Sequence, residues 1–140
     1  MVIADTGFFI ALLNRTDRYH RRAKAALQGL DEGLITTWPV LTETCHILLK
    51  RGGVFPMTRF MEQVMRGSCE IFDIPKEMYP KILKLMAKYH DLPMDLADAS
   101  LLLLAENLNA GKILSTDERD FKTYRWKDHA PFTNLLKLGS

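Results

Sequence analysis

The sequence predicts an α/β fold, a three-layer α/β/α sandwich around a central, mostly parallel sheet of four to five strands. The first observation is that short apolar runs without alternation recur along the chain, as in strands buried on both faces. The second is that helical stretches separate these runs, which favours parallel strands joined by crossover helices. The third is that no internal repeat or linker interrupts the pattern, so we expect residues 1–140 to form a single domain.

The first half of the chain predicts two strands and four helices. In chain order we expect a strand over Met1–Ala4, a helix over Thr6–Asn14, a helix that follows the basic stretch Arg15–Lys24 and ends at Leu30, a strand over Leu34–Thr36, a helix from Thr37 to Lys50, and a helix over Pro56–Met65. Thr37 is a suitable helix cap, and Pro39 falls in the first turn, where its missing N–H does no harm. The third helix should stop at Gly52-Gly53, because glycine favours helix ends.

The second half predicts three strands and two helices. We expect a strand over Cys69–Ile74, a helix over Lys76–Tyr89, a helix over Leu96–Asn109 capped by Asp95, a strand over Lys112–Ser115 and a fifth strand over Pro131–Leu136. The run Leu101–Leu104 should be core. Nothing in this prediction depends on whether the final Gly139-Ser140 is native.

Composition places the chain among ordinary globular proteins. It is 47% hydrophobic and 26% charged, and its net charge of +2 does not by itself point to nucleic acid. Cys45 and Cys69 have no zinc-like spacing, so we expect two reduced thiols. No apolar run approaches the roughly 18–20 residues of a membrane span, and Asp5 interrupts the N-terminus too early for a signal peptide. We therefore expect a cytoplasmic protein without a membrane partner.

Two acids lie just beyond the ends of predicted strands. Asp5 comes after the first strand and Asp117 comes soon after the fourth. Because ligands bind beyond the carboxyl ends of parallel strands, both acids should reach the same edge of the sheet. Either acid alone is equally well explained as a turn or cap residue.

Glu43 is harder to explain as an ordinary surface acid. It shares a predicted helix face with Val40 and Ile47, and burying a lone carboxylate is costly unless it is paired or coordinates a metal. A salt bridge to Lys50 or Arg51 is the alternative, and we favour a functional role.

Asp98 has the same character as Glu43. It lies on the apolar stripe of its helix, three and four residues before Leu101 and Leu102. The alternative is a capping box begun by Asp95, which we assign mainly to capping. Asp120, three residues after Asp117, is a candidate auxiliary acid.

The chemistry of four clustered carboxylates points to a cation. Two unit charges 4 Å apart repel by about 4 kcal/mol at an effective dielectric of 20, so the cluster needs protons or bound cations. Ligation by oxygen alone selects Mg²⁺ or Mn²⁺, and a pair of such ions can clamp the attacking and leaving oxygens of a phosphodiester. Asp5, Glu43, Asp98 and Asp117 are therefore the candidate catalytic and metal-binding residues.

Four segments resemble the ordered signatures of PIN-domain nucleases, and the most similar subgroup is the VapC-like toxins of bacterial and archaeal toxin–antitoxin pairs. The segments are Met1–Gly7, Leu41–Glu43, Asp95–Leu101 and Leu114–Phe121. Each motif alone is a weak signal, whereas four in this order are a specific one. The resemblance covers nearly the whole chain.

The resemblance implies a PIN-like fold and Mg²⁺- or Mn²⁺-dependent cleavage of RNA. It implies that an antitoxin protein inserts into the active-site groove and that the protein forms a homodimer. The residues that match the family's functional positions are Asp5, Glu43, Asp98 and Asp117 for the acidic quartet, Asp120 for a frequent fifth acid, and Thr6 and Thr116 for supporting hydroxyl groups. The acidic pattern is complete, so we expect an active enzyme.

Basic residues near the acidic motifs are candidates for RNA binding. They are Arg15, Arg18, Arg119 and Lys122, with Tyr19, Tyr124 and Trp126 interleaved. They are suited to holding phosphates or stacking bases, although a solvated surface explains Arg15 and Arg18 equally well.

Three other functions compete with a ribonuclease. A phosphatase or phosphoacceptor using Asp5 is disfavoured, because such phosphatases usually carry an acid two residues later, where this chain has Gly7. A non-catalytic RNA-binding or regulatory module on the same fold is disfavoured by the intact acids. A nuclease that acts on DNA stays open.

Overall fold

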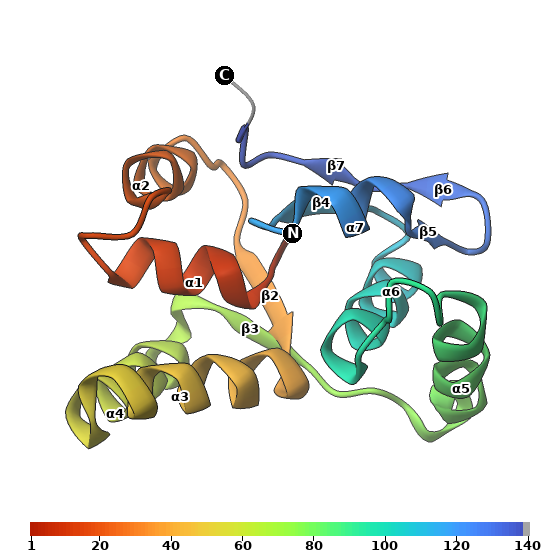
Figure 1. The fold of residues 1–140 in the computed structure, drawn as a ribbon, viewed down its shortest axis with the longest axis horizontal. Coiled ribbons are helices and arrows are strands. Elements are labelled where there is room, and N and C mark those ends of the chain that lie inside the picture. The colour runs from red at the N-terminus through yellow and green to blue at the C-terminus, as the bar shows by residue number, and fades with distance from the viewer. Residues whose placement is uncertain (139–140) are drawn as a thin grey trace.

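The computed structural model describes residues 1–138, so Gly139-Ser140 lies outside the described part. Its centre is a parallel sheet in the order β3-β2-β1-β4-β7 (Figure 1). The strands are β1 (Val2–Ala4), β2 (Leu34–Thr37), β3 (Glu70–Phe72), β4 (Lys112–Leu114) and β7 (Thr133–Asn134). A parallel sheet of five strands is at the upper end of the predicted range.

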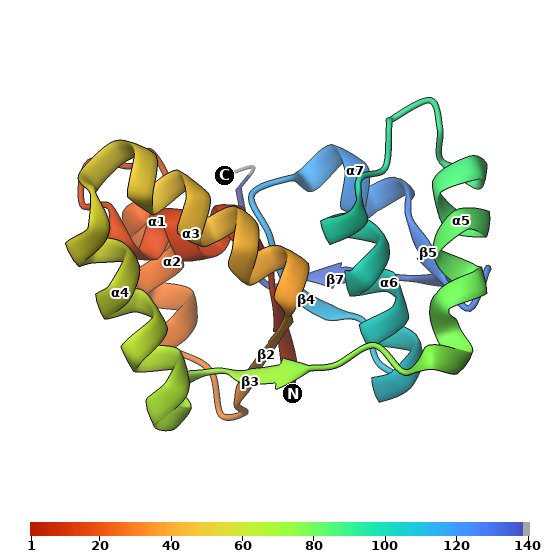
Figure 2. The same cartoon turned by 90° about the horizontal axis from the view of Figure 1, so that it is seen from below.

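Helices cover both faces of this sheet. One group comprises α1 (Thr6–Leu13), α2 (His20–Gln28), α3 (Trp38–Gly52) and α4 (Val54–Gln63), and the other contains α5 (Tyr79–Lys88) and α6 (Leu96–Leu108). Two views at right angles show the groups on opposite sides of the sheet (Figures 1 and 2). The predicted three-layer α/β/α sandwich is confirmed.

The core lies between the sheet and these helices. Leu101–Leu104 of α6 are completely buried, as predicted, because α6 packs on β1 and β2 with one side and on α5 with another. The sheet contributes Ile3 and Ile113, which face each other in register and have no exposed surface. A run of four leucines is thereby enclosed on all sides, which explains why it shows no polar face.

Strand register brings two chain segments together at one edge of the sheet. Ala4 of β1 pairs with Leu114 of β4, and the Asp5 N–H donates to the Leu114 carbonyl at 3.1 Å. Asp5 and Ser115 are therefore neighbours immediately beyond the carboxyl ends of adjacent strands, where open parallel sheets bind ligands.

The C-terminal region differs from the prediction. The helix α7 (Glu118–Thr123) was not predicted, and a small antiparallel hairpin of β5 (Arg125–Trp126) and β6 (Ala130–Pro131) follows it. The predicted strand over 131–136 is replaced by the end of β6 and by β7, which pairs with β4. Only two residues of β7 join the sheet, because the Asn134 side chain takes over part of the pairing with the segment after β4.

Several helix and strand ends differ from the predicted ones by a few residues. The α4 helix begins at Val54, before the predicted Pro56, and continues as a wider helical turn over Val64–Ser68. A short helical turn, Lys76–Met78, precedes α5, and β3 is shorter than predicted. Both cysteines are free thiols, as expected. Within residues 1–138, no helix is long and apolar enough to span a membrane.

Candidate active site

Asp5 is fixed at the end of β1, where it caps α1. One carboxylate oxygen, Oδ1, accepts the Thr6 N–H at 2.8 Å, and Oδ2 accepts the Ser115 hydroxyl at 2.8 Å. Only 8% of the residue is exposed. Burial raises the pKa of Asp5 to about 6, although the two hydrogen bonds oppose that rise, and negative charge at Glu43 and Asp117 adds to it.

Ser115 connects two of the predicted acids. Its hydroxyl donates to Asp5 and accepts the Asp117 N–H at 3.0 Å. Its backbone is held by the Asn134 amide, which accepts the Ser115 N–H at 3.2 Å and donates to the Ser115 carbonyl at 2.9 Å. Ser115 was not among the predicted site residues, because only the strand register of the folded chain places it beside Asp5.

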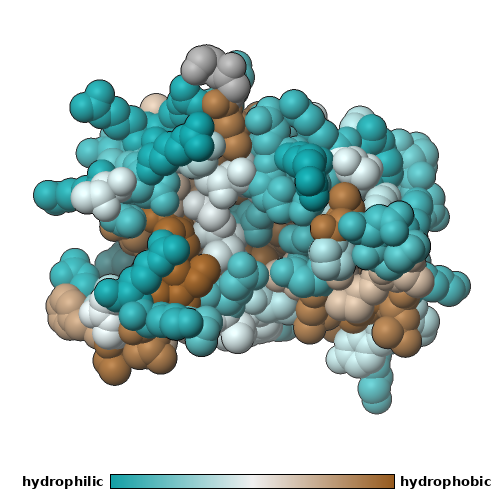
Figure 3. Space-filling view, viewed as in Figure 1, coloured by the Kyte–Doolittle hydropathy of each residue, from teal (hydrophilic) through white to brown (hydrophobic). Residues whose placement is uncertain are grey.

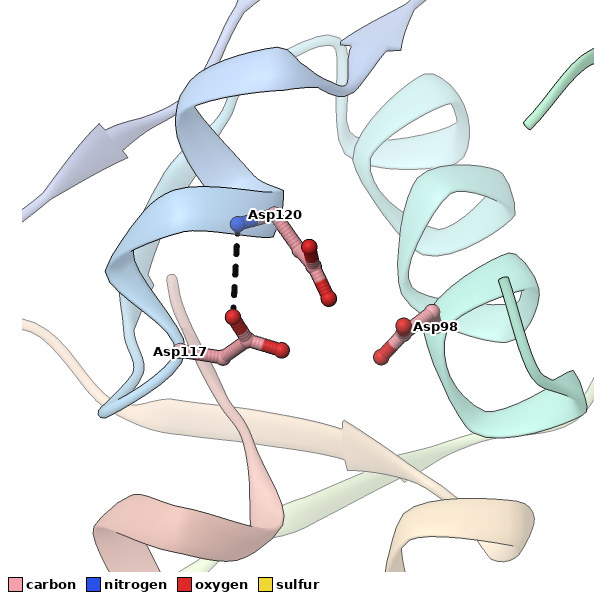
Figure 4. A group of neighbouring side chains, drawn as sticks. All are labelled: Asp98, Asp117 and Asp120. Atoms are coloured by element: carbon pink, nitrogen blue, oxygen red, sulfur yellow. Dashed lines mark hydrogen bonds between the residues drawn. The ribbon is translucent and has the colours of Figure 1, made fainter. Parts of the chain in front are cut away.

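Three carboxylates converge where α6 faces α7. Asp98, Asp117 and Asp120 each offer an oxygen within 4.8 Å of the others, and their side chains point toward one another (Figure 4). Asp117 caps α7 by accepting the Asp120 N–H at 3.3 Å. Burial and the neighbouring Asp120 carboxyl raise the pKa of Asp117. The structure thus brings the uncertain fifth acid, Asp120, directly into the cluster.

Asp98 is the most strongly perturbed acid of this group. Burial raises its pKa to about 8, and the charges of Asp95, Asp5 and Asp117 add to the rise. The opposing effect comes from the Tyr124 hydroxyl, which donates to Asp98 Oδ2 at 2.7 Å. Tyr124 has no exposed surface, so the prediction that it is available for base stacking is wrong.

An aromatic cluster holds Tyr124 in place. Its ring makes edge contacts with Tyr89 and Phe121, with ring centroids 5.0 and 5.1 Å apart. Burial and the adjacent carboxylate raise the pKa of the Tyr124 hydroxyl, so it stays protonated and acts as a donor. No sequence signal connected this tyrosine with Asp98, because 26 residues separate them.

All the predicted acids line one groove of about 480 Å³. Glu43 lies there beside Ile47, but its side chain is exposed, so the expected burial on an apolar face is wrong. Within residues 1–138 it forms no ion pair with Lys50 or Arg51. Partial desolvation and then the charge of Asp95 raise the pKa of Glu43. The alternative of a salt bridge is therefore not realised.

The remaining candidates occupy varied positions. Asp95 caps α6 by accepting the Asp98 N–H at 2.8 Å, as predicted, and it also lines the groove. The Thr6 hydroxyl donates to the Val40 carbonyl at 3.3 Å, which links α1 to α3. Thr116 packs against Gly7, where an added Cβ would lie 1.8 Å from the Thr116 Oγ1.

The four basic candidates for RNA binding differ in their position relative to the groove. Arg18 lines the groove with the acids. Arg15 and Arg119 are exposed outside it, and Lys122 pairs with Glu118 at 3.0 Å on the surface of α7. Of these four, Arg18 is the one whose position fits contact with a ligand in the groove.

The donor set fits a hard divalent cation. Asp120 Oδ1 is buried and accepts no hydrogen bond from residues 1–138, and the Arg119 Nε 3.6 Å away forms only a distant ion pair with it. An unsatisfied buried carboxylate oxygen is costly, and a cation held by Asp98, Asp117 and Asp120 would satisfy it. Carboxylate oxygens without histidine or thiolate ligands are the set that Mg²⁺ and Mn²⁺ prefer.

A parallel α/β/α sandwich with an acidic groove at the carboxyl ends of its strands is the arrangement of a PIN-type nuclease. The family model of the PIN domain matches residues 2–127, and the chain belongs to this family. Two of the proteins that it resembles are named as VapC proteins, which confirms the expected resemblance. The ribonuclease VapC26 of Mycobacterium tuberculosis (strain H37Rv) is 22% identical over 124 residues, which cover 89% of this chain and 92% of the relative.

Two solved structures share the fold. VapC20 of Mycobacterium tuberculosis, a toxin that cleaves the sarcin–ricin loop, superposes with a TM-score of 0.77 at 18% identity, over 84% of this chain and 91% of that one. A toxin–antitoxin complex from Klebsiella pneumoniae superposes with a TM-score of 0.64 at 19% identity, over 86% of this chain and 90% of that one.

Proposed function

We propose that the protein is a Mg²⁺- or Mn²⁺-dependent endoribonuclease that hydrolyses RNA phosphodiester bonds. The observation that carries this proposal is the convergence of Asp98, Asp117 and Asp120, with a buried oxygen of Asp120 that accepts no hydrogen bond from residues 1–138. The family and the ribonuclease relative support phosphodiester chemistry on RNA.

The acids divide the work in this proposal. Asp98, Asp117 and Asp120 hold the cation, and Asp5 and Glu43 add negative charge and acceptor oxygens in the same groove. When bound, a divalent cation supplies charge stabilisation to the phosphate and lowers the pKa of water for in-line attack. Asp5 and Asp98 keep their carboxylates oriented through hydrogen bonds from Ser115 and Tyr124.

Thr6 and Thr116 support the site through contacts between the segments that carry the acids in this proposal. Thr6 joins the N-terminus of α1 to α3, which carries Glu43. Thr116 fills the space above Gly7 and so sets the distance between α1 and the segment that carries Asp117. Their role is to hold the acids at fixed separations.

We further propose that the protein is the toxin of a type II toxin–antitoxin pair and acts in the cytoplasm. A cognate antitoxin and a second copy of the chain are then its protein partners. The solved toxin–antitoxin complex with the same fold supports the first partner. Apolar side chains gathered over α3 and α4 (Figure 3), including Val54 and Phe55 at 62% and 70% exposure, favour protein contacts on this surface.

The test is cleavage of labelled single-stranded RNA by the purified protein. We expect cleavage to stop in EDTA, to return with Mg²⁺ or Mn²⁺, and to be lost in Asp5→Asn and Asp98→Asn with the fold retained. Asp31→Asn, which removes an exposed carboxylate outside the groove, should cleave normally.

Other results would contradict the proposal in distinct ways. Cleavage that persists in EDTA and in both variants would exclude the acidic groove as the catalytic site. RNA binding without cleavage would favour the non-catalytic module, and equal cleavage of single-stranded DNA would favour the DNA nuclease.

A further inference from the structure

One end of the acidic groove is lined by cationic and aromatic side chains. Besides the acids, its lining includes Arg18, Tyr19 and Arg51, with Ile10 and Ile47 along the way. Arg18 and Tyr19 belong to the segment between α1 and α2, and Arg51 is in the last turn of α3. A single concave surface therefore joins a carboxylate cluster to a cationic and aromatic end.

The segment that carries Arg18 and Tyr19 is held by its own hydrogen bonds. The Asp17 N–H donates to the Asn14 carbonyl at 3.0 Å, and the Asp17 carboxylate accepts the Tyr19 N–H at 2.8 Å. The Tyr19 ring is partly buried against the core, and the Arg18 guanidinium lies over it, 5.0 Å from the ring centre. Tyr19 thus holds a flat cationic group at the groove.

The guanidinium groups of Arg18 and Arg51 are available to bind an anion. Among residues 1–138, neither Arg18 nor Arg51 forms an ion pair, although seven carboxylates line the same groove. Asp17, the acid beside Arg18, accepts the Tyr19 N–H through one oxygen, and within residues 1–138 it forms no ion pair with Arg18. Cations left unpaired next to a groove are suited to phosphates, and planar guanidinium groups also stack on bases.

We propose that this end of the groove binds a nucleotide that flanks the scissile phosphate of single-stranded RNA. The base stacks on the Arg18 guanidinium, which Tyr19 supports from behind, and Arg51 pairs with a flanking phosphate. This inference rests on the proposed ribonuclease function and deepens it, because it assigns substrate-binding residues outside the acidic cluster.

The experiment measures the affinity of a fluorescent single-stranded RNA in the Asp98→Asn background, which prevents cleavage. We expect Tyr19→Leu and Arg51→Gln each to weaken binding about tenfold, the size expected for one stacking or phosphate contact. Arg51→Gln should also lower the dependence of log Kd on log salt by about 0.7, as for one lost phosphate contact on a single strand.

Two matched variants serve as controls. Tyr19→Phe keeps the ring under Arg18 and should bind like the Asp98→Asn parent. Arg66→Gln removes an exposed arginine from a different hollow, between α3 and α4, and should also bind normally. Circular dichroism checks the fold of every variant, and Arg51→Gln is safe in this respect because Arg51 is exposed.

The outcomes separate this inference from the function on which it rests. If Tyr19→Leu binds as well as Tyr19→Phe, and Arg51→Gln as well as Arg66→Gln, while the wild-type protein cleaves RNA, then only the nucleotide site is overturned. If the wild-type protein neither binds nor cleaves RNA, the ribonuclease function is overturned and the nucleotide site with it.

Discussion

Tyr124 is a fully buried residue whose hydroxyl donates a hydrogen bond to a candidate metal ligand, Asp98. We expect Tyr124→Phe to keep the fold, since the ring and its aromatic neighbours remain, and to lose about 1 kcal/mol of stability. The Asp98 carboxylate would lose its donor, and such losses typically lower metal affinity or activity about 10- to 100-fold. Mn²⁺ affinity, measured by calorimetry alongside RNA cleavage, tests this.

Tyr89 provides the matched control for Tyr124. It belongs to the same aromatic cluster, but its hydroxyl accepts the Arg125 N–H at 3.0 Å and hydrogen-bonds to no carboxylate of residues 1–138. Tyr89→Phe should therefore lose a similar amount of stability and keep its Mn²⁺ affinity. Equal Mn²⁺ affinity in the two variants would show that Tyr124 has only a structural role.

The acids of the site could be predicted from the sequence, whereas the residues that position them could not. Asp5 and Asp117 follow strands, and Asp98 interrupts an apolar helix face, so their local patterns reveal them. Ser115 and Tyr124 act across the fold, through contacts that separate segments make only after folding. Glu43 was identified by an argument that fails, because its helix face opens into the groove and leaves the side chain exposed.

The first helix approaches the segment after β4 so closely that only glycine fits at one position. An alanine Cβ at position 7 would lie 1.8 Å from the Thr116 Oγ1 and 3.0 Å from its Cβ. We expect Gly7→Ala to lower the free energy of unfolding by about 1–3 kcal/mol, as overpacking usually does, and to reduce cleavage. Urea denaturation measures the first effect.

Gly29→Ala is the control for this close approach. An alanine Cβ there would lie 3.5 Å from the nearest atom, the Ala25 carbonyl oxygen, which is an ordinary contact. It should be neutral or slightly stabilising. Adding Thr116→Ala to Gly7→Ala removes the colliding hydroxyl and should recover part of the lost stability. A Gly7→Ala protein as stable as Gly29→Ala would contradict the packing argument.

Most elements could be predicted, because strands buried on both faces and helices with apolar periods leave clear patterns. The elements that could not be predicted are short. The α7 helix has only six residues and is ordered by the Asp117 cap and the burial of Phe121. The β5–β6 hairpin turns through Lys127 and Asp128 at positive φ, where glycine or asparagine is the usual signal. Two-residue strands carry no period to detect.

At the scale of the whole molecule, the clustered acids lower the stability of the metal-free fold when they ionise. The pKa values of about 6 for Asp5 and about 8 for Asp98 lie above the usual carboxyl value, so the folded state holds protons that the unfolded chain has released. Stability is therefore greatest at low pH within this window and falls as the pH rises from about 4 to about 8. The opposite effect of Glu32, whose pKa is lowered to about 2 by hydrogen bonds from Lys112 and the N-terminus, is confined to lower pH.

Metal-free protein should accordingly unfold more easily at pH 8 than at pH 5.5, by about 3 kcal/mol in urea denaturation with EDTA. Mg²⁺ or Mn²⁺ should restore stability at pH 8, because a cation that binds the folded state compensates the ionised carboxylates.

Asp98→Asn keeps an acceptor for Tyr124 without the charge, so it should exceed the wild-type protein in stability at pH 8 and match it at pH 5.5. Asp31→Asn, which alters an exposed acid outside the groove, should follow the wild-type curve. If the stability of Asp98→Asn depends on pH as that of the wild-type protein does, the charge of Asp98 does not limit stability. A cation would then not stabilise the fold by compensating that charge.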